Sequence, residues 1–239
     1  MHKFGNTMTK RILAAGALAA LVTSPTYAQD EGDVAVEDAM AAPAERAPLQ
    51  YAKINYDVQE DRDNILLLDL SNGERIAIRL MPDWAPGHVD RVKTLTRQGF
   101  YDGIVFHRVI EGFMAQTGDP TGTGQGGSSL PDLQAEFNPM PHVRGSVSMA
   151  RSNSEDSANS QFFLVFYPRF NLDKRYTNFG RVISNMAAVD AIQRGEPPAN
   201  PTRIVQASIA SDNKPQAMPQ PAAPEREITL DDLTAPIEG

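Results

Sequence analysis

The sequence predicts a single, mainly β domain that folds as a closed antiparallel barrel. Short apolar runs recur along the chain and are separated by Gly, Pro and Asn turn signals, which is typical of antiparallel barrels. Only two segments have a helical pattern, and strands do not alternate with helices, which argues against a parallel α/β fold. The patterned segment, residues 52–210, has the length of one domain with one core.

The domain is predicted to begin with a β-hairpin. Residues 65–70 (ILLLDL) and 75–80 (RIAIRL) are apolar enough to form strands. Asn72-Gly73 lies between them and is a strong signal for a tight hairpin turn.

A helix is predicted next, over residues 85–99. Val89, Val92 and Leu95 recur at three-residue spacing, and Gly99 can end the helix. The remaining predicted elements are strands at 105–110, 113–117, 146–150, 161–167, 178–183 and 204–210, and a short helix near 186–194.

Residues 1–28 have the pattern of a secretory signal peptide. Lys10 and Arg11 precede an apolar run, Ile12–Val22, and small residues lead to a cleavage site after Ala28. The run is too short to span a bilayer, which needs about 20 apolar residues. The alternative is a buried N-terminal helix. The signal interpretation predicts a soluble protein exported to the periplasm.

Charge and composition limit the partners. Without residues 1–28 the chain has 19 basic and 30 acidic side chains, a net charge of −11, which argues against binding nucleic acid or an anionic membrane surface. The chain has no cysteine, so disulfides, thiol catalysis and a cysteine-linked lipid anchor are excluded. We expect a monomer without a stable membrane anchor.

Both ends of the chain differ in composition from the domain. Residues 29–51 form an acidic leader rich in Ala and Pro, and residues 211–239 form an acidic tail of similar kind. Neither shows a clear period, so both are interpreted as flexible spacers. Functional arms that bind client proteins are the alternative.

Three patterns that suggest other chemistry are rejected. Gly122, Gly124 and Gly127 fit a dinucleotide fingerprint, but no helix opens after them, so a mobile surface loop is the better interpretation. His88 and His142, with His107, lack metal-ligand spacing, so no metal or other cofactor is expected. The serines lack a nucleophile elbow.

The stretch VFHRVIEGFMAQTGDP, residues 105–120, places Arg108 and Gln116 inside apolar runs. His107 next to Arg108 faces the other side of a strand, so it is interpreted as an interior histidine, with a catalytic base as the alternative. Arg108 itself could form a salt bridge that closes the barrel wall. Alternatively it lies partly exposed in a groove that a ligand completes, because an unpaired buried charge is costly.

Several motifs together resemble the cyclophilin family of peptidyl-prolyl cis/trans isomerases. They are FHRVIEGFMAQTGDP, GTGQGG, SVSMAR, NSQFFLVF and YTNFGRVI, in this order between about Asp61 and Ala210. The segments YDGIVFHRV and GEPPANP resemble the bacterial branch of the family. The resemblance implies an eight-stranded antiparallel barrel capped by two helices, and catalysis of X–Pro rotation without a cofactor. The implied partners are Pro-containing segments of unfolded or partly folded exported proteins.

The resemblance also assigns site residues. Arg108 matches the catalytic arginine, and Gln116 orients it or binds the substrate backbone. The positions that match the peptide-binding groove are Phe113, Met114, Ala150, Arg151, Gln161, Phe163, Asn171, Leu172 and Tyr176.

Two of these positions depart from the family pattern. Asn171 stands where many members have tryptophan, and Tyr176 stands where many have histidine. Phe170 could replace the missing tryptophan only if the loop slips by one residue. The departure at Asn171 leaves a second function open, a periplasmic chaperone or Pro-peptide-binding module with little isomerase activity. A barrel that holds a small ligand inside is a third.

Overall fold

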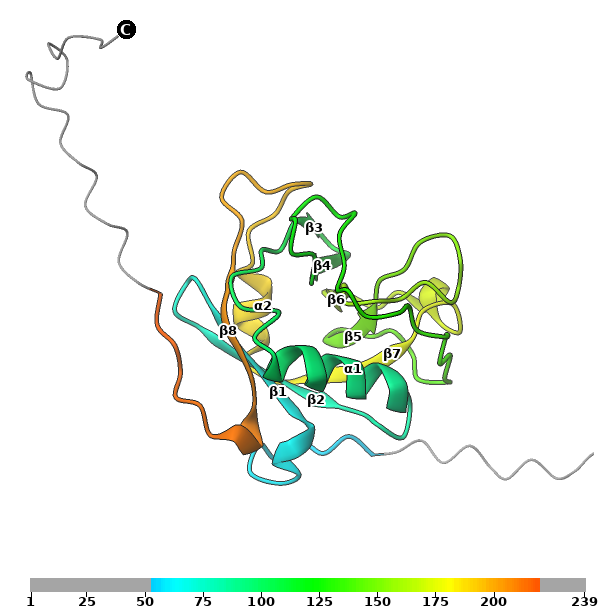
Figure 1. Ribbon diagram of the computed structural model, residues 1–239, viewed down its shortest axis with the longest axis horizontal. Coiled ribbons are helices and arrows are strands. Elements are labelled where there is room, and N and C mark those ends of the chain that lie inside the picture. The colour runs from blue at the N-terminus through cyan, green and yellow to red at the C-terminus, as the bar shows by residue number, and fades with distance from the viewer. Residues whose placement is uncertain (1–52, 220–239) are drawn as a thin grey trace, which may run out of the picture. The chain divides into compact units, whose positions relative to one another are not determined.

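The computed structural model describes residues 53–219, which form a mainly β domain (Figure 1). The strands of this part of the chain are β1 (Ile65–Leu70), β2 (Arg75–Leu80), β3 (Arg108–Ile110), β4 (Met114–Thr117), β5 (Ser146–Met149), β6 (Phe162–Val165), β7 (Asn178–Ser184) and β8 (Ile204–Ile209). The helices are α1 (Pro86–Arg97), α2 (Met186–Asp190) and three short 3-10 helices, η1 (Arg62–Asn64), η2 (Phe170–Leu172) and η3 (Ala210–Asp212). The predicted signal peptide, the leader and the tail beyond residue 219 lie outside the described residues.

The strands form one antiparallel sheet, but the sheet does not close. Its order is β3-β4-β6-β5-β7-β2-β1-β8, so β3 and β8 are its two edges. The sheet is an open, curled half-barrel, and the prediction of a closed barrel is therefore wrong. The predicted elements themselves are confirmed, with β3, β6 and α2 shorter than expected.

Proline explains why the two edges do not pair as strands. Residues 195–202 (GEPPANPT) lead into β8, and their prolines have no N–H to donate to a ladder. Two isolated bridges, Val105 to Arg203 and Val109 to Gly195, join the two sides, and the Phe106 amide donates to the Thr202 carbonyl at 2.9 Å. The two edges therefore approach each other through isolated backbone contacts and not through a continuous ladder.

Local signals in the sequence set the hairpin and the long helix. Gly73 adopts a positive φ of 85° in the β1–β2 turn, which a side chain would disfavour. Helix α1 begins with Pro86 at its first position, and its N-cap residue has no capping side chain. Glu136 takes that role by accepting hydrogen bonds from the Gly87 amide at 2.9 Å and the His88 amide at 3.0 Å.

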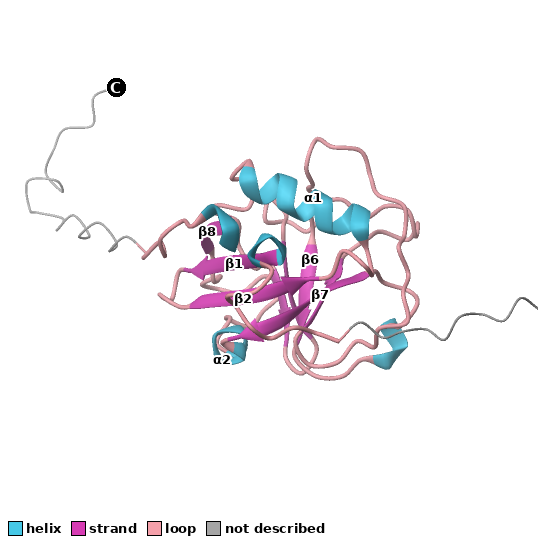
Figure 2. Ribbon diagram, turned by 90° about the horizontal axis from the view of Figure 1, so that it is seen from below, coloured by secondary structure: helices cyan, strands magenta, loops and turns pink. Residues whose placement is uncertain are grey.

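The inner face of the sheet carries the main core. Val109, Ala115, Leu164 and Val147 are successive cross-strand partners from β3 to β5, and each is at most 1% exposed. Aromatic rings at Tyr101, Phe162 and Phe179 pack edge to face within this core. Both helices contribute buried residues to it, and Figure 2 shows α1 and α2 on opposite sides of the strands. This filled interior contradicts the hollow barrel that the small-ligand interpretation requires.

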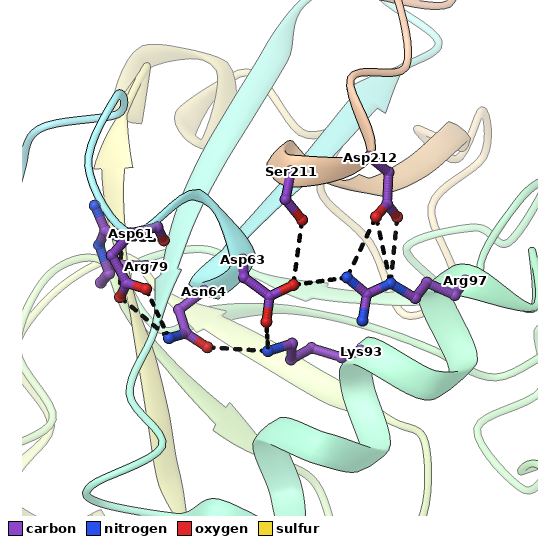
Figure 3. A network of polar contacts seen from close by, with 8 residues as sticks. All are labelled: Asp61, Asp63, Asn64, Arg79, Lys93, Arg97, Ser211 and Asp212. Atoms are coloured by element: carbon purple, nitrogen blue, oxygen red, sulfur yellow. Dashed lines mark hydrogen bonds and ion pairs between the residues drawn. The ribbon is translucent and has the colours of Figure 1, made fainter.

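A charged cluster holds both ends of the described domain against α1 (Figure 3). Asp63 of η1 accepts hydrogen bonds from Lys93 and from Arg97, the latter at 2.7 Å. Arg97 also pairs with Asp212 of η3 at 3.2 Å, and Ser211 donates to Asp63 at 3.2 Å. The cluster therefore joins segments that are about 150 residues apart in sequence.

Acid is expected to weaken this cluster. The hydrogen bonds from Lys93 and then Arg97 lower the pKa of Asp63 to about 2, below its usual 3.8. A lowered pKa means that the contribution to stability is present above the unfolded value and is lost as pH falls through about 2. Asp63 is 54% exposed, so screening limits the contribution to at most about 1 kcal/mol.

Urea unfolding of Asp63→Asn measures this contribution. We expect the variant to be less stable than the wild type at neutral pH, with the difference shrinking between about pH 4 and about pH 2. Asp90→Asn on α1 is the control, because Asp90 is exposed and makes no side-chain hydrogen bond within residues 53–219. If the difference in unfolding free energy between Asp63→Asn and the wild type stays constant down to pH 2, the ionised Asp63 carboxylate is not its source.

The beginning of the predicted tail lies against the sheet. The Ala217 amide donates to Asp69 at 2.8 Å, and Gln206 donates to the Pro215 carbonyl at 3.0 Å. Gln216 donates to the Gly73 carbonyl at 3.1 Å. Within residues 53–219, no helix is both long enough and apolar enough to cross a bilayer.

Candidate active site

Arg108 and Gln116 lie on the face of the sheet that points away from the main core. They are direct partners across β3 and β4, and Gln116 is the partner of Phe163 on β6. Their sequence neighbours Val109 and Ala115 point to the core. Because successive residues of a strand point to opposite faces, the polar pair and the phenylalanine share the outer face.

A second apolar cluster occupies this outer face. Its buried members are Met114, Phe163, Val165 and Leu172, and the partly buried residues packed against it are Ile110, Phe113, Ala150 and Tyr176. The rings of Phe163 and Tyr176 meet edge to face at 5.7 Å. The strand alternation thus builds an apolar surface with Arg108 and Gln116 along one side.

Arg108 is partly exposed and paired with a carboxylate. Its Nε donates to Oε2 of Glu196 at 2.8 Å, and the two side chains are 44% and 50% exposed. A salt bridge is therefore present, as one interpretation of the sequence required. It does not bury the guanidinium, which stays accessible to a ligand.

Gln116 belongs to a chain of hydrogen bonds that ends in the glycine-rich loop. Its Nε2 donates to Oε1 of Gln161 at 2.9 Å. The Nε2 of Gln161 donates to the carbonyls of Gly124 at 3.1 Å and Gly126 at 2.7 Å. The loop is therefore fixed to the same outer face as Arg108.

The buried Asp119 carboxylate holds the same loop through hydrogen bonds. It accepts hydrogen bonds from Thr121 and from the Gly124 amide at 2.6 Å. Burial raises the pKa of Asp119, but these hydrogen bonds outweigh it and lower the pKa to about 2. A Cβ on Gly126 would lie 2.1 Å from Asp119 Oδ1, which requires glycine there. The expected mobile loop is thus held by side-chain and backbone contacts, and its glycines serve its packing.

A groove of about 500 Å³ lies beside this loop. Gln116, Ala150, Arg151 and Gln161 line it, together with residues 124–128 of the loop. Arg151 stacks over the Tyr176 ring at 4.8 Å and donates to the Arg175 carbonyl at 3.1 Å. The groove and the apolar cluster share Ala150, so they adjoin at that residue.

Comparison with known proteins identifies the family. The family model described as cyclophilin type peptidyl-prolyl cis-trans isomerase/CLD matches residues 66–209. The chain belongs to the cyclophilin family. It is a peptidyl-prolyl cis-trans isomerase, as the resemblance in the sequence implied.

Curated cyclophilin relatives carry the same activity in their names. A probable peptidyl-prolyl cis-trans isomerase of Brucella suis is 46% identical over 170 residues, which cover 64% of this chain and 86% of the relative. Peptidyl-prolyl cis-trans isomerase B of Bacillus subtilis is 41% identical over 128 residues, which cover 53% of this chain and 89% of the relative.

Solved cyclophilin structures share the fold. The crystal structure of cyclophilin AquaCyp293 from Hirschia baltica has a TM-score of 0.60 and 29% identity, over 66% of this chain and 78% of that one. A Cryptosporidium parvum cyclophilin type isomerase, solved in the presence of the dipeptide Ala-Pro, has a TM-score of 0.57 and 26% identity. That match covers 61% of this chain and 98% of the other.

The structure brings most of the residues assigned by the cyclophilin resemblance together on one face. Asn171 differs, because it is exposed next to Leu172, which is buried in the apolar cluster. Phe170 is 63% exposed and lies outside that cluster. The loop has therefore not slipped by one residue, and Phe170 does not replace the missing tryptophan.

Sequence reasoning missed two charged residues of the site. Glu196 pairs with Arg108 from 88 positions away, and Arg169 stacks over the Phe113 ring at 5.2 Å. Arg169 also donates to the Gly112 carbonyl at 2.6 Å. The contacts of Glu196 with Arg108 and of Arg169 with Phe113 join residues that are far apart in sequence, so no local sequence pattern indicates them. The segment GEPPANP contains Glu196, but the resemblance assigns it no role.

His107 is buried, as the interior interpretation predicted. Its exposed fraction is 5%, and a Cβ on Gly124 would lie 3.6 Å from its ring. Burial lowers the pKa of His107, which keeps the imidazole neutral at neutral pH. Among residues 53–219, no three His, Asp or Glu side chains gather in a way that could hold a metal ion.

Proposed function

We propose that Arg108 catalyses the rotation by donating a hydrogen bond to the prolyl nitrogen of an X–Pro bond. The X–Pro amide is conjugated, and its rotation barrier is about 18–20 kcal/mol. When the bond is twisted, the nitrogen regains a lone pair. A donor directed at that lone pair stabilises the twisted state more than the planar one, which is the requirement for catalysis.

One such donor, together with a surface that anchors the proline ring, can account for the required acceleration of X–Pro exchange. Uncatalysed exchange takes tens to hundreds of seconds, so exchange in about a millisecond requires roughly 10⁴–10⁵-fold acceleration, or about 5.5–7 kcal/mol. One preorganised donor supplies about 2.7–4 kcal/mol in other enzymes. Holding the proline ring while the acyl side turns supplies the rest. No covalent intermediate is needed.

The outer apolar cluster is the proposed anchor for the ring. Phe113, Met114, Phe163 and Leu172 offer contact to an apolar five-membered ring, with Tyr176 closing the edge. Arg108 stands two residues before Ile110 on the same face of β3, so donor and anchor share one surface. This juxtaposition is the observation on which the proposal depends. Gln116 borders Arg108 and can bind the substrate backbone.

The remaining groove residues are proposed to hold the peptide before the proline. Ala150, Arg151 and Gln161 line the groove that adjoins the apolar cluster. The Cryptosporidium relative was solved in the presence of Ala-Pro, which supports a Pro-containing peptide as the ligand of this chain. Asn171 is exposed beside Leu172 and is proposed to border the peptide.

The proposed substrates are Pro-containing segments of exported proteins that are unfolded or partly folded. The signal-like pattern of residues 1–28 supports a periplasmic location. Cell fractionation of the full chain, with and without residues 1–28, tests this location. Recovery of the unaltered chain in the cytoplasm would contradict it.

A chaperone that binds proline peptides with little isomerase activity is the second candidate, because Asn171 lacks the apolar surface of tryptophan. Exchange NMR on a short Ala-Pro peptide and aggregation of an unfolded client, both measured with the full chain, separate the two. We expect catalysed exchange and, for Arg108→Ala, its loss. Aggregation protection without catalysed exchange would favour the chaperone.

A further inference from the structure

We propose that Glu196 is a positioning residue for Arg108. Its carboxylate holds the Nε edge of the guanidinium and leaves the two Nη groups for the substrate. The inference rests on the proposed role of Arg108. It assigns to the loop between α2 and β8 a part in the isomerase site.

The backbone fixes Glu196 beside Arg108. The amides and carbonyls of Gly195 and Val109 exchange two hydrogen bonds, at 2.8 and 2.9 Å, so residue 195 is joined to the edge of β3. Gly195 has a φ of +142°, and a Cβ there would lie 2.6 Å from Pro198 Cα. Only glycine fits this turn, which brings the next residue, Glu196, to the outer face.

The residue before Gly195 holds the loop from the other side. Arg194 pairs through its Nε with Oε2 of Glu111 at 2.8 Å. Its guanidinium also stacks over the Phe166 ring at 4.2 Å. The loop is therefore attached to the β3–β4 turn and to the core. These contacts restrict the backbone that carries Glu196.

The ion pair occupies only one edge of the Arg108 guanidinium. Nε bonds to Glu196, and the Nη groups make no hydrogen bond to any of residues 53–219. A guanidinium has five donors in a planar fork, so fixing Nε also sets the direction of the Nη donors. These donors remain available at the border of the apolar cluster.

Glu196 acts mainly by restricting the conformations of the Arg108 side chain, and less through its charge. A half-exposed arginine on an edge strand can adopt many rotamers, and holding it in place reduces the cost of aligning it in the transition state. The carboxylate also offsets part of the positive charge. Because both side chains are about half exposed, water screens that offset. The net effect of Glu196 is therefore to favour turnover.

Three variants of the full chain test the inference. Glu196→Ala removes the acceptor, and Glu196→Gln keeps an acceptor of the same length without the charge. Asp190→Ala is the matched control, because it breaks the ion pair with Arg144, whose side chains are also about half exposed at 40% and 42%, without touching Arg108 or Glu196. Turnover at saturating Ala-Pro peptide, KM and the Arg108 Nε–Hε resonance are measured for each.

We expect Glu196→Ala to lower turnover by roughly two- to fivefold, in the range of exposed ion pairs, with KM nearly unchanged. Glu196→Gln is expected to lower turnover less than Glu196→Ala does. Hydrogen exchange at Arg108 Nε is expected to accelerate in Glu196→Ala and to stay as in the wild type in Asp190→Ala. Unchanged or faster turnover in Glu196→Ala, or an equal loss in Asp190→Ala, would overturn the inference. If Arg108→Ala instead keeps wild-type turnover, the proposed role of Arg108 fails separately.

Discussion

Replacing Arg108 by alanine is expected to lower kcat/KM for a short Ala-Pro peptide by about a hundredfold or more, the usual effect of removing one preorganised donor. Arg108→Lys is expected to recover only a small part of the activity. A lysine ammonium carries the charge, but it lacks the planar fork that fixes donor direction. Stability should change little, because the ion pair lost with Arg108 is about half exposed.

A coupled peptide assay and a urea unfolding curve check this prediction together. Lys214→Ala is the charge-matched control, since Lys214 is exposed and makes no side-chain hydrogen bond within residues 53–219. A loss in Lys214→Ala as large as in Arg108→Ala would mean that net charge, and not the donor, is responsible. A fall in activity matched by unfolding would likewise contradict the proposed role.

Replacing Phe163 by alanine is expected to impair both binding and stability. Phe163 is 5% exposed and lies in the outer cluster against Tyr176. Phe→Ala at such a position costs about 3–5 kcal/mol of folding free energy in a core, and the lower end is expected on this outer face. Peptide KM should rise, because the removed ring is also the proposed floor of the proline pocket.

Phe163→Leu and Phe170→Ala make this prediction specific. Phe163→Leu keeps an apolar side chain of similar size, so it should fold while losing the edge-to-face contact with Tyr176, worth about 0.5–1.5 kcal/mol. Phe170→Ala should leave stability within about 0.5 kcal/mol, because Phe170 is 63% exposed. Equal KM for Phe163→Leu and the wild type would exclude Phe163 from the pocket. A large loss in Phe170→Ala would mean that Phe170 closes it.

The secondary structure could be predicted largely from local patterns. The Asn72-Gly73 turn and the apolar spacing of α1 are local signals, and the corresponding elements are present. Strand β3 was predicted three residues too long, because residues 105–107 resemble a strand, although the proline-rich segment pairs with them only through an isolated bridge from Val105 to Arg203. Whether the barrel closes depends on residues 195–202, which are distant in sequence from β3. The pattern of the strands alone could therefore not exclude a closed barrel.

The site was predictable where it depends on strand alternation and on family motifs. The alternation separates Arg108 and Gln116 from the core residues Val109 and Ala115. The support of Arg108 was not predictable, because Glu196 reaches it through a turn that is 88 positions away. The order of the glycine loop also depends on distant side chains, since Gln161 holds it through the carbonyls of Gly124 and Gly126.

The exchange rate of saturating Ala-Pro peptide bound to Arg108→Ala tests the central claim most directly. At saturation, a change in binding no longer affects the rate, so exchange NMR reports the bond rotation itself. The donor role predicts a rate at least about a hundredfold below that of the wild type, with a peptide Kd within a few-fold of it. Wild-type exchange in the saturated variant would contradict the claim that Arg108 stabilises the twisted X–Pro bond.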